Sequence, residues 1–190
     1  MFEILTGMGL AMPAGLNAYI PLLAVGIADR YFGLINLAAP YDLIATPGGI
    51  AIITALLVVE VVADKIPLID HLNDLINSAI RPSAGAIVLM ASTDTIDYVN
   101  PIFAMVLGLL LAGGVHTVKT AVRPAVTATT GGVGNPIVSA AEDGAAIGIS
   151  IIALIAPVLV AFLLVALLVG LVWILHLRRT RPAAADPPGG

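Results

Sequence analysis

Two groups of ionisable residues could do chemistry, because each lies at the end of a long apolar run. Glu60 and Asp64 are four residues apart and therefore share one face of a helix. His116, Lys119 and Arg123 follow the spacing i, i+3, i+7 and share one face of another helix. Charged groups are costly inside a bilayer and are usually kept there because they bind or move something. The two groups therefore indicate an ion or proton pathway, or an anion site at Lys119 and Arg123.

A structural role is the alternative interpretation of the same residues. Acidic and basic stripes on neighbouring helices can pair and thereby fix the register of the helices. Asp64, Lys65 and Arg123 can also extend their side chains to the lipid headgroups. We favour this interpretation for Lys65 and Arg123, and a functional one for Glu60 and His116, which lie deeper in their apolar runs.

Breaks within apolar runs are a second signal. Gly15 and Asn17 interrupt the first run, and the sequence Gly-Gly-Val-Gly-Asn-Pro at 131–136 interrupts a later one. A broken membrane helix frees backbone carbonyls and helix ends that can coordinate an ion or a substrate. Asn17 and Asn135 are therefore candidate ligands, although glycines can also serve only for close helix packing. Tyr19 is a further candidate, for which packing or an interfacial position is an equally good explanation.

The elements that must position these residues belong to a membrane protein. Of the 190 residues, 59% are hydrophobic and 11% are charged, whereas soluble domains carry about 25% charged residues. Between Asp143 and Arg178 there is no Asp, Glu, Lys or Arg, and this stretch exceeds the roughly 20 residues that cross a bilayer. The absence of cysteine excludes disulfides and thiolate metal sites. A net charge of -4 does not suit nucleic acid as a partner.

Catalytic motifs are missing from the sequence. There is no nucleophile elbow, His-Glu-x-x-His sequence or phosphate loop. Asp70, His71 and Asp74 could supply metal ligands on one helical turn, but an exposed helix face explains them better. We therefore expect no enzyme, no cofactor and no metal site.

We expect an all-α integral membrane protein with about six transmembrane helices, some short or broken. Residues 68–79 predict an amphipathic helix on the cytoplasmic surface. Residues 1–178 then form one membrane-embedded domain, whose halves, 1–93 and 100–178, would allow a 3+3 inverted repeat. Residues 179–190 are expected to be a disordered cytoplasmic tail. The expected spans are about Phe2 to Ala28, Gly49 to Asp64, Arg81 to Ser92, Pro101 to Val122, Ala125 to Ala141 and Ala145 to Leu177.

The basic residues orient these spans, because Lys and Arg gather on the cytoplasmic side of a membrane. With the N-terminus in the cytoplasm, all Lys and Arg except Arg30 fall on the cytoplasmic side. Both termini are therefore predicted to be cytoplasmic. An arrangement with five crossings and a re-entrant loop from Thr127 to Ala141 ranks second, because it forces Arg123 and Glu142 to the same side.

Four motifs of the chain are distinctive: Gly15-Leu16-Asn17-Ala18-Tyr19-Ile20-Pro21, Ala63-Asp64-Lys65-Ile66-Pro67, Ile80-Arg81-Pro82 and Gly134-Asn135-Pro136. They resemble those of the bacterial membrane family catalogued as domain of unknown function 4126. The resemblance covers nearly the whole chain apart from the tail. It implies a bacterial multi-pass protein, which we place in the cytoplasmic (inner) membrane, and it implies no activity.

The leading hypothesis is a small transporter or channel that moves a small polar or ionic solute through a site formed by broken helices. Its partners are the lipid bilayer and the solute, and its small spans suggest a homo-oligomer. In this hypothesis the asparagines coordinate, the carboxylates carry protons or cations, and the basic residues supply the counter-charge. The first alternative is a non-transporting assembly or accessory protein, in which Glu60 forms a dry pair with Lys119 or His116. The second is a lipid-handling protein with a groove open to lipid. The expected site residues are Asn17, Tyr19, Glu60, Asp64, His116, Lys119, Arg123 and Asn135.

Overall fold

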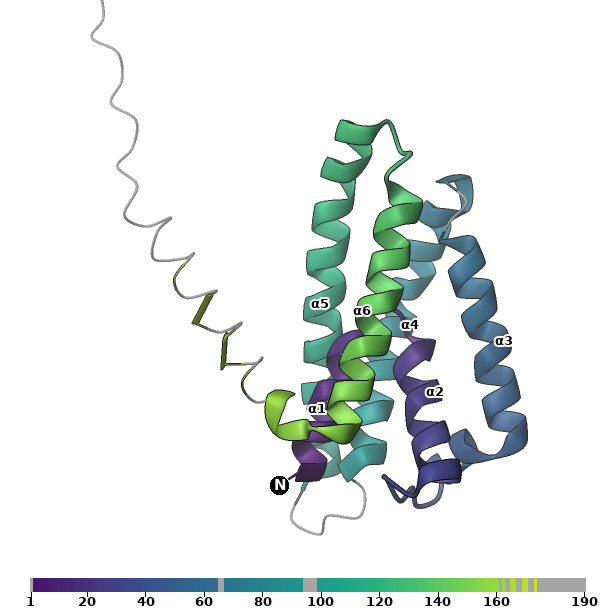
Figure 1. Ribbon diagram of the computed structural model, residues 1–190, viewed down its shortest axis with the longest axis vertical. Coiled ribbons are helices and arrows are strands. Elements are labelled where there is room, and N and C mark those ends of the chain that lie inside the picture. Colours follow the sequence, from purple (N-terminus) through teal and green to yellow (C-terminus); the bar gives the residue numbers. More distant parts are fainter. Residues whose placement is uncertain are drawn as a thin grey trace, which may run out of the picture.

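The computed structural model describes residues 2–64, 67–93 and 99–160, and positions 162, 165, 166, 169, 170 and 173. For residues 67–74 it describes the backbone only. The described chain is all-helical and contains no strand, which confirms the expected fold class (Figure 1). The elements are α1 (Phe2–Ala14), α2 (Tyr19–Ile27), a π-helical turn (Ala28–Phe32), a 3-10 turn (Tyr41–Ala45), α3 (Pro47–Ala63), α4 (Pro67–Thr93), α5 (Pro101–Thr130) and α6 (Asn135–Ile155).

Local sequence signals set several of these boundaries. α3 begins after Thr46, whose hydroxyl accepts a hydrogen bond from the Gly49 backbone N–H at 3.0 Å. α5 begins after Asn100, whose side-chain oxygen accepts from the backbone N–H of Ile102 at 2.8 Å. α5 ends at Thr130, and the next residue, Gly131, caps the helix with a φ of +61°, a conformation that glycine adopts without strain.

The first apolar run turns back on itself, and the prediction of one span from Phe2 to Ala28 is therefore wrong. α1 and α2 run in opposite directions on either side of the break at 15–18 (Figure 1). The start of α1 lies beside the end of α4, where a Cβ on Gly7 would be 3.1 Å from Ser92 Cβ. The end of α2 lies against the 3-10 turn, where a Cβ on Gly26 would be 2.6 Å from the carbonyl oxygen of Ile44. This turn and the end of α4 line the same small cavity, so both ends of the α1–α2 hairpin lie at one end of the bundle.

The remaining expected boundaries also change. The expected amphipathic helix at 68–79 is not a separate element, because it forms the first part of α4. α5 is 30 residues long and continues past Pro124, and α6 begins at Asn135. The expected span from Ala125 to Ala141 is therefore wrong, because the turn at 131–134 divides it between two antiparallel helices (Figure 1). A proline inside a membrane helix removes one hydrogen bond without necessarily ending the helix, and α4 and α5 accordingly continue through Pro82 and Pro124.

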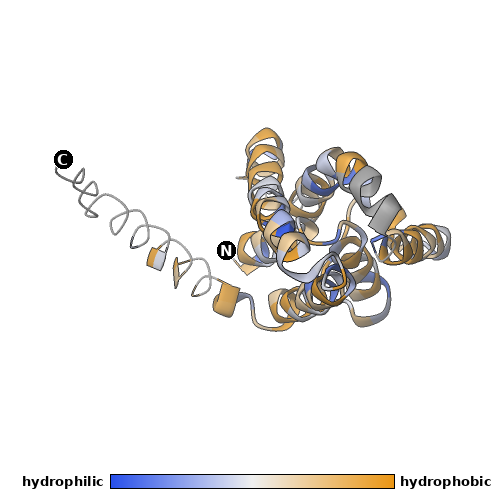
Figure 2. Cartoon of the chain, turned by 90° about the horizontal axis from the view of Figure 1, so that it is seen from above, coloured by the Kyte–Doolittle hydropathy of each residue, from blue (hydrophilic) through white to orange (hydrophobic). Residues whose placement is uncertain are grey.

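The composition of the helices suits a membrane. Among the described residues, three helices are long and apolar enough to cross one: Leu75–Thr93, Pro101–Thr130 and Asn135–Ile155. α1 and α3 are shorter apolar helices. Large apolar side chains such as Ile52, Leu110 and Ile155 are exposed, and the end-on view shows apolar residues on the outer faces of the helices (Figure 2). These features support a membrane protein, whereas six crossings and an inverted repeat stay predictions. The expected tail, 179–190, and the second half of the expected last span lie largely outside the described residues.

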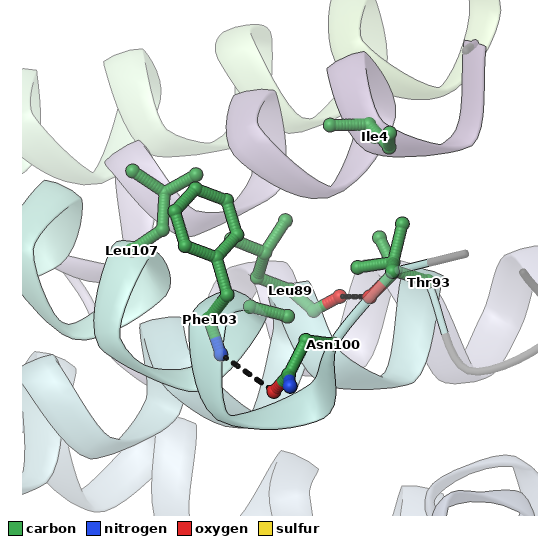
Figure 3. A pocket seen from close by; sticks show the side chains of 8 residues that line it. Ile4, Leu89, Thr93, Asn100, Phe103 and Leu107 are labelled. Carbon is green, nitrogen blue, oxygen red and sulfur yellow. Dashed lines mark hydrogen bonds between the residues drawn. The ribbon is translucent and has the colours of Figure 1, made fainter. Parts of the chain in front are cut away.

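α4 and α5 touch backbone to backbone and then diverge. A Cβ on Gly85 would lie 2.7 Å from the carbonyl oxygen of Gly108, so only small residues fit at this crossing. Divergence on either side of the crossing leaves two recesses. The first, of about 320 Å³, lies between α1, the end of α4 and the start of α5, and its walls are mostly apolar (Figure 3). Its Asn100 caps α5, so this polar side chain is explained by the helix start.

Candidate functional site

Ionisable side chains from four helices meet in one buried cluster, which we call the charge network. Its members lie in α3, α4, α5 and α6, and all but one are less than a tenth exposed. The exception is Glu142, whose side chain is 14% exposed. The members are Glu60, Asp64, Arg81, His116, Lys119, Arg123 and Glu142.

Arg81 lies at the centre of the network and is fully buried. It donates to Glu60 Oε1 from Nε at 3.2 Å and from Nη2 at 3.0 Å, and Nη2 lies 3.5 Å from Asp64 Oδ2. Its Nη1 lies 3.3 Å from His116 Nδ1. Because a guanidinium can only donate, Nδ1 must accept, and His116 is therefore a neutral imidazole with its proton on Nε2.

Lys119 joins the network to the break between α1 and α2. Its Nζ donates to the carbonyl oxygen of Leu16 at 3.1 Å and lies 2.9 Å from Glu142 Oε2. Asp64 Oδ2 is 3.6 Å from the same nitrogen. The carbonyl that the break frees thus accepts a hydrogen bond from a cation. That cation is a side chain of the protein itself.

Arg123 completes the network at α6. Its Nη2 lies 3.0 Å from Glu142 Oε2 and 3.9 Å from Asp64 Oδ2. Ser139 is fully buried, and its hydroxyl lies 3.5 Å from Asp64 Oδ2. Arg123 and Glu142 therefore lie at the same level of the bundle, as only the second-ranked arrangement required.

The charges of the network balance. Three carboxylates, Glu60, Asp64 and Glu142, are set against three cations, Arg81, Lys119 and Arg123. With a neutral His116 the formal sum is zero. Pairing of this kind offsets the free energy that is lost when each charge leaves water.

The two asparagines occupy different places. Asn17 is fully buried; its Nδ2 donates to Asp143 Oδ1 at 3.0 Å, and its Oδ1 accepts from the backbone N–H of Tyr19 and Ile20. Asn135 instead exchanges hydrogen bonds with the Thr127 hydroxyl at 3.1 and 3.2 Å. Since Asn135 lies eight residues from Asp143 on α6, the two sites are about 12 Å apart along the helix. The asparagines therefore do not form one joint site.

The second recess, which we call the α4–α5 groove, adjoins the network. It has a volume of about 1310 Å³ and is an open groove, not an enclosed cavity. Hydroxyl groups from both helices line it, and His116 and Arg123 belong to both the groove and the network. Asn135 lies at the end of the groove formed by the α5–α6 turn. Its main polar side chains are Ser78, His116, Thr117, Thr120, Arg123 and Thr127.

Two members of the charge network, Arg81 and Glu142, are not among the site residues expected from the sequence. Arg81 was expected only at the start of a span, as one of the basic residues that orient the chain. Glu142 fell between two expected spans, whereas α6 begins seven residues earlier. With the correct helix start, the sequence would have shown that Asn135, Ser139 and Glu142 share one face of α6. Lys65 and the side chains of Asp70, His71 and Asp74 lie outside the described residues.

The family described as Domain of unknown function (DUF4126) matches residues 4–177 of the chain. The chain belongs to this family. No curated protein and no solved structure matches it. The matched DUF4126 region contains the whole charge network and the α4–α5 groove, and it ends before the expected tail. The family description states no activity, so the function must be argued from the geometry of the site.

Proposed function

We propose that this chain is a small membrane transporter or channel that passes a small polar or ionic solute. The observation that supports the proposal is the charge network, in which seven ionisable side chains are buried beside a large open groove. Ionisable residues within membrane helices commonly mark pathways for solutes, ions or protons. The groove gives a solute access to the network through His116 and Arg123.

The groove offers both donors and acceptors to such a solute. The hydroxyl of Thr117 donates to the carbonyl of Gly113 at 2.7 Å, and that of Thr120 donates to the carbonyl of His116 at 3.1 Å. Each hydroxyl oxygen therefore keeps lone pairs that can accept from a solute. Nε2–H of His116 is the matching donor. A solute carboxylate or phosphate could also compete with Glu142 for Arg123.

We propose a membrane orientation that follows the hairpin. Arg81, Lys119 and Arg123 lie toward the end with the α3–α4 and α5–α6 turns, whereas Asp29 and Asp42 lie at the opposite end. The distribution of basic residues then favours the cytoplasm for the first end. α1 starts, and α2 ends, at the end of the bundle that carries Asp29 and Asp42. In this orientation that end faces the outer side of the membrane, and the N-terminus lies there too. Only a further crossing by the last apolar run would return Arg178 to the cytoplasm.

Proteoliposomes with purified full-length protein test the function. We expect the wild type to carry at least one solute from a panel of labelled amino acids, sugars, carboxylates, phosphate and alkali cations, or protons reported by internal pyranine. His116→Ala and Glu60→Gln should reduce this flux to the level of empty vesicles. Thr54→Val is the matched control, because the Thr54 hydroxyl is exposed and bonds only to its own helix at Ile50 O. Equal flux in all four proteins, or no flux in the wild type, would contradict the proposal.

A second candidate function is lipid handling, and the open shape of the groove favours it. Apolar Leu75, Pro82 and Pro124 line the groove together with the hydroxyls, so an amphiphile could lie there with its headgroup near Arg123. Transfer of a fluorescent phospholipid between leaflets, measured by dithionite quenching, separates the two functions. The accessory-protein alternative required a dry pair of Glu60 with Lys119 or His116, whereas Glu60 contacts Arg81 and a groove lies beside the network.

A further inference from the structure

Three oxygens surround the ammonium of Lys119, and they come from separate parts of the chain. They are the Leu16 carbonyl at the α1–α2 break, Glu142 Oε2 and Asp64 Oδ2, at 3.1, 2.9 and 3.6 Å. Lys119 itself is only 4% exposed. Such a set of a backbone carbonyl at a helix break and two carboxylates is one that hard cations prefer.

The position of the Leu16 carbonyl at the end of α1 also favours a bound cation. Leu16 follows the last turn of α1, where the carbonyl end of a helix carries a partial negative charge. One further acceptor is present in the network, because Glu60 Oε2 is buried and makes no hydrogen bond within the described part of the chain. The three oxygens around the ammonium therefore match its three N–H donors, and the network holds one more buried carboxylate oxygen that no described donor uses.

The charge count defines which cation would fit. Counted over the described side chains, Arg81 and Arg123 alone cannot balance Glu60, Asp64 and Glu142, so the network without the lysine charge carries a formal charge of -1. His116 adds nothing while Arg81 donates to its Nδ1. Asp143 lies on the other side of the break, where it accepts from Asn17. One monovalent cation would restore neutrality.

We infer that the oxygens of Leu16, Asp64 and Glu142 form a monovalent-cation site that the chain fills with its own Lys119 ammonium. Removal of the lysine side chain beyond Cβ opens a space at these oxygens and leaves the negative charge. Sodium then takes the place of the ammonium. The wild type has no need of sodium at this site, since the site is already filled. This inference concerns a binding site and does not depend on the proposed transport.

Thermal stability of the purified full-length protein in detergent tests the inference, with NaCl, KCl or choline chloride at equal ionic strength. The wild type should have the same Tm in all three salts. Lys119→Ala should have a lower Tm in choline chloride, and sodium should raise it with a saturable dose dependence. At ten times the Kd the rise should be about 3 to 6 °C.

Two further variants separate a specific site from a general salt effect. Lys119→Met removes the charge but fills most of the space, so it should lose stability and gain little from sodium. Lys119→Ala combined with Glu142→Gln restores a neutral network without a cation and should show no sodium dependence. The inference is wrong if Lys119→Ala has one Tm in all salts, or if the double variant gains as much from sodium. It is also wrong if Lys119→Ala cannot be purified in any salt while the double variant can.

Discussion

Replacement of Arg81 by methionine should be among the most destabilising single changes in this chain. Methionine has a similar length but no charge, so Glu60 would lose both of its hydrogen bonds from Arg81, and the network would carry a formal charge of -1. Glu60 is only 3% exposed, so bulk water does not replace the lost hydrogen bonds at the position that it occupies. Removal of one partner from a buried ion pair costs about 3–5 kcal/mol. For a chain of this size, that loss corresponds to a fall in Tm of about 6 to 20 °C.

The informative measurement is a comparison of two double variants. Arg81→Met with Glu60→Met removes both partners and leaves Asp64 and Glu142 balanced by Lys119 and Arg123. Its Tm should recover most of the loss, because an apolar pair replaces an ion pair. Arg81→Met with Glu142→Met has the same formal charge but leaves Glu60 without its arginine, so it should not recover.

The assay is thermal denaturation of each variant in the same detergent, followed by size-exclusion chromatography of the soluble fraction. Comparable stability of the two double variants would refute the argument, because it would mean that total charge matters and the specific Arg81–Glu60 contact does not. A loss below about 1 kcal/mol for Arg81→Met alone, a size typical of an exposed pair, would refute it as well.

Two other predictions concern the fold. Gly108→Ala should destabilise the protein by about 1–3 kcal/mol, because the added Cβ would overlap the α4 backbone at the crossing. Gly114→Ala on the same helix is the control, because its Cβ would meet nothing within 4 Å, and it should be neutral or slightly stabilising. Thermal denaturation of both variants checks this prediction. Because the chain has no cysteine, a single introduced cysteine reports on which side of the membrane its position lies. Glu3→Cys and Leu34→Cys should react with an impermeant maleimide added to one side of the membrane. Val133→Cys should react only when the maleimide is added to the other side. Labelling of Glu3→Cys from the Val133 side would disprove the hairpin.

The charged stripes and the first break could be predicted from the sequence because both are local. Helical spacing alone places Glu60 with Asp64 and His116 with Lys119, whatever the rest of the chain does. A glycine two residues before an asparagine in an apolar run, as at Gly15 and Asn17, likewise marks a helix break without any tertiary information. The structure brings the two stripes together at the contact of Asp64 with Lys119.

The direction of the chain after the break could not be predicted from the sequence. Hydropathy is the same for a run that crosses the bilayer and for one that enters and returns, so α1 and α2 were joined into one span. The turn depends on a distant contact, because Gly15 at the break packs against the backbone of His116, where a Cβ would be 3.0 Å from its nitrogen. Arg81 and Glu142 were missed for a related reason, since one expected span begins at Arg81 and another ends at Ala141, whereas both residues lie inside longer helices, α4 and α6.

The helix break and the ionisable residues are directly connected, because the helix ends on both sides of the break contact ionisable side chains. The carbonyl side of the break, at Leu16, accepts from Lys119. The opposite side is capped by Asn17, whose amide donates to Asp143 on α6. A solute in the α4–α5 groove that draws Arg123 away from Glu142 would leave Glu142 to Lys119 alone. The position of Lys119, and with it the Leu16 carbonyl, would then respond to the solute. Under the proposed transport function, the α1–α2 hairpin would then be the element that responds to occupation of the groove.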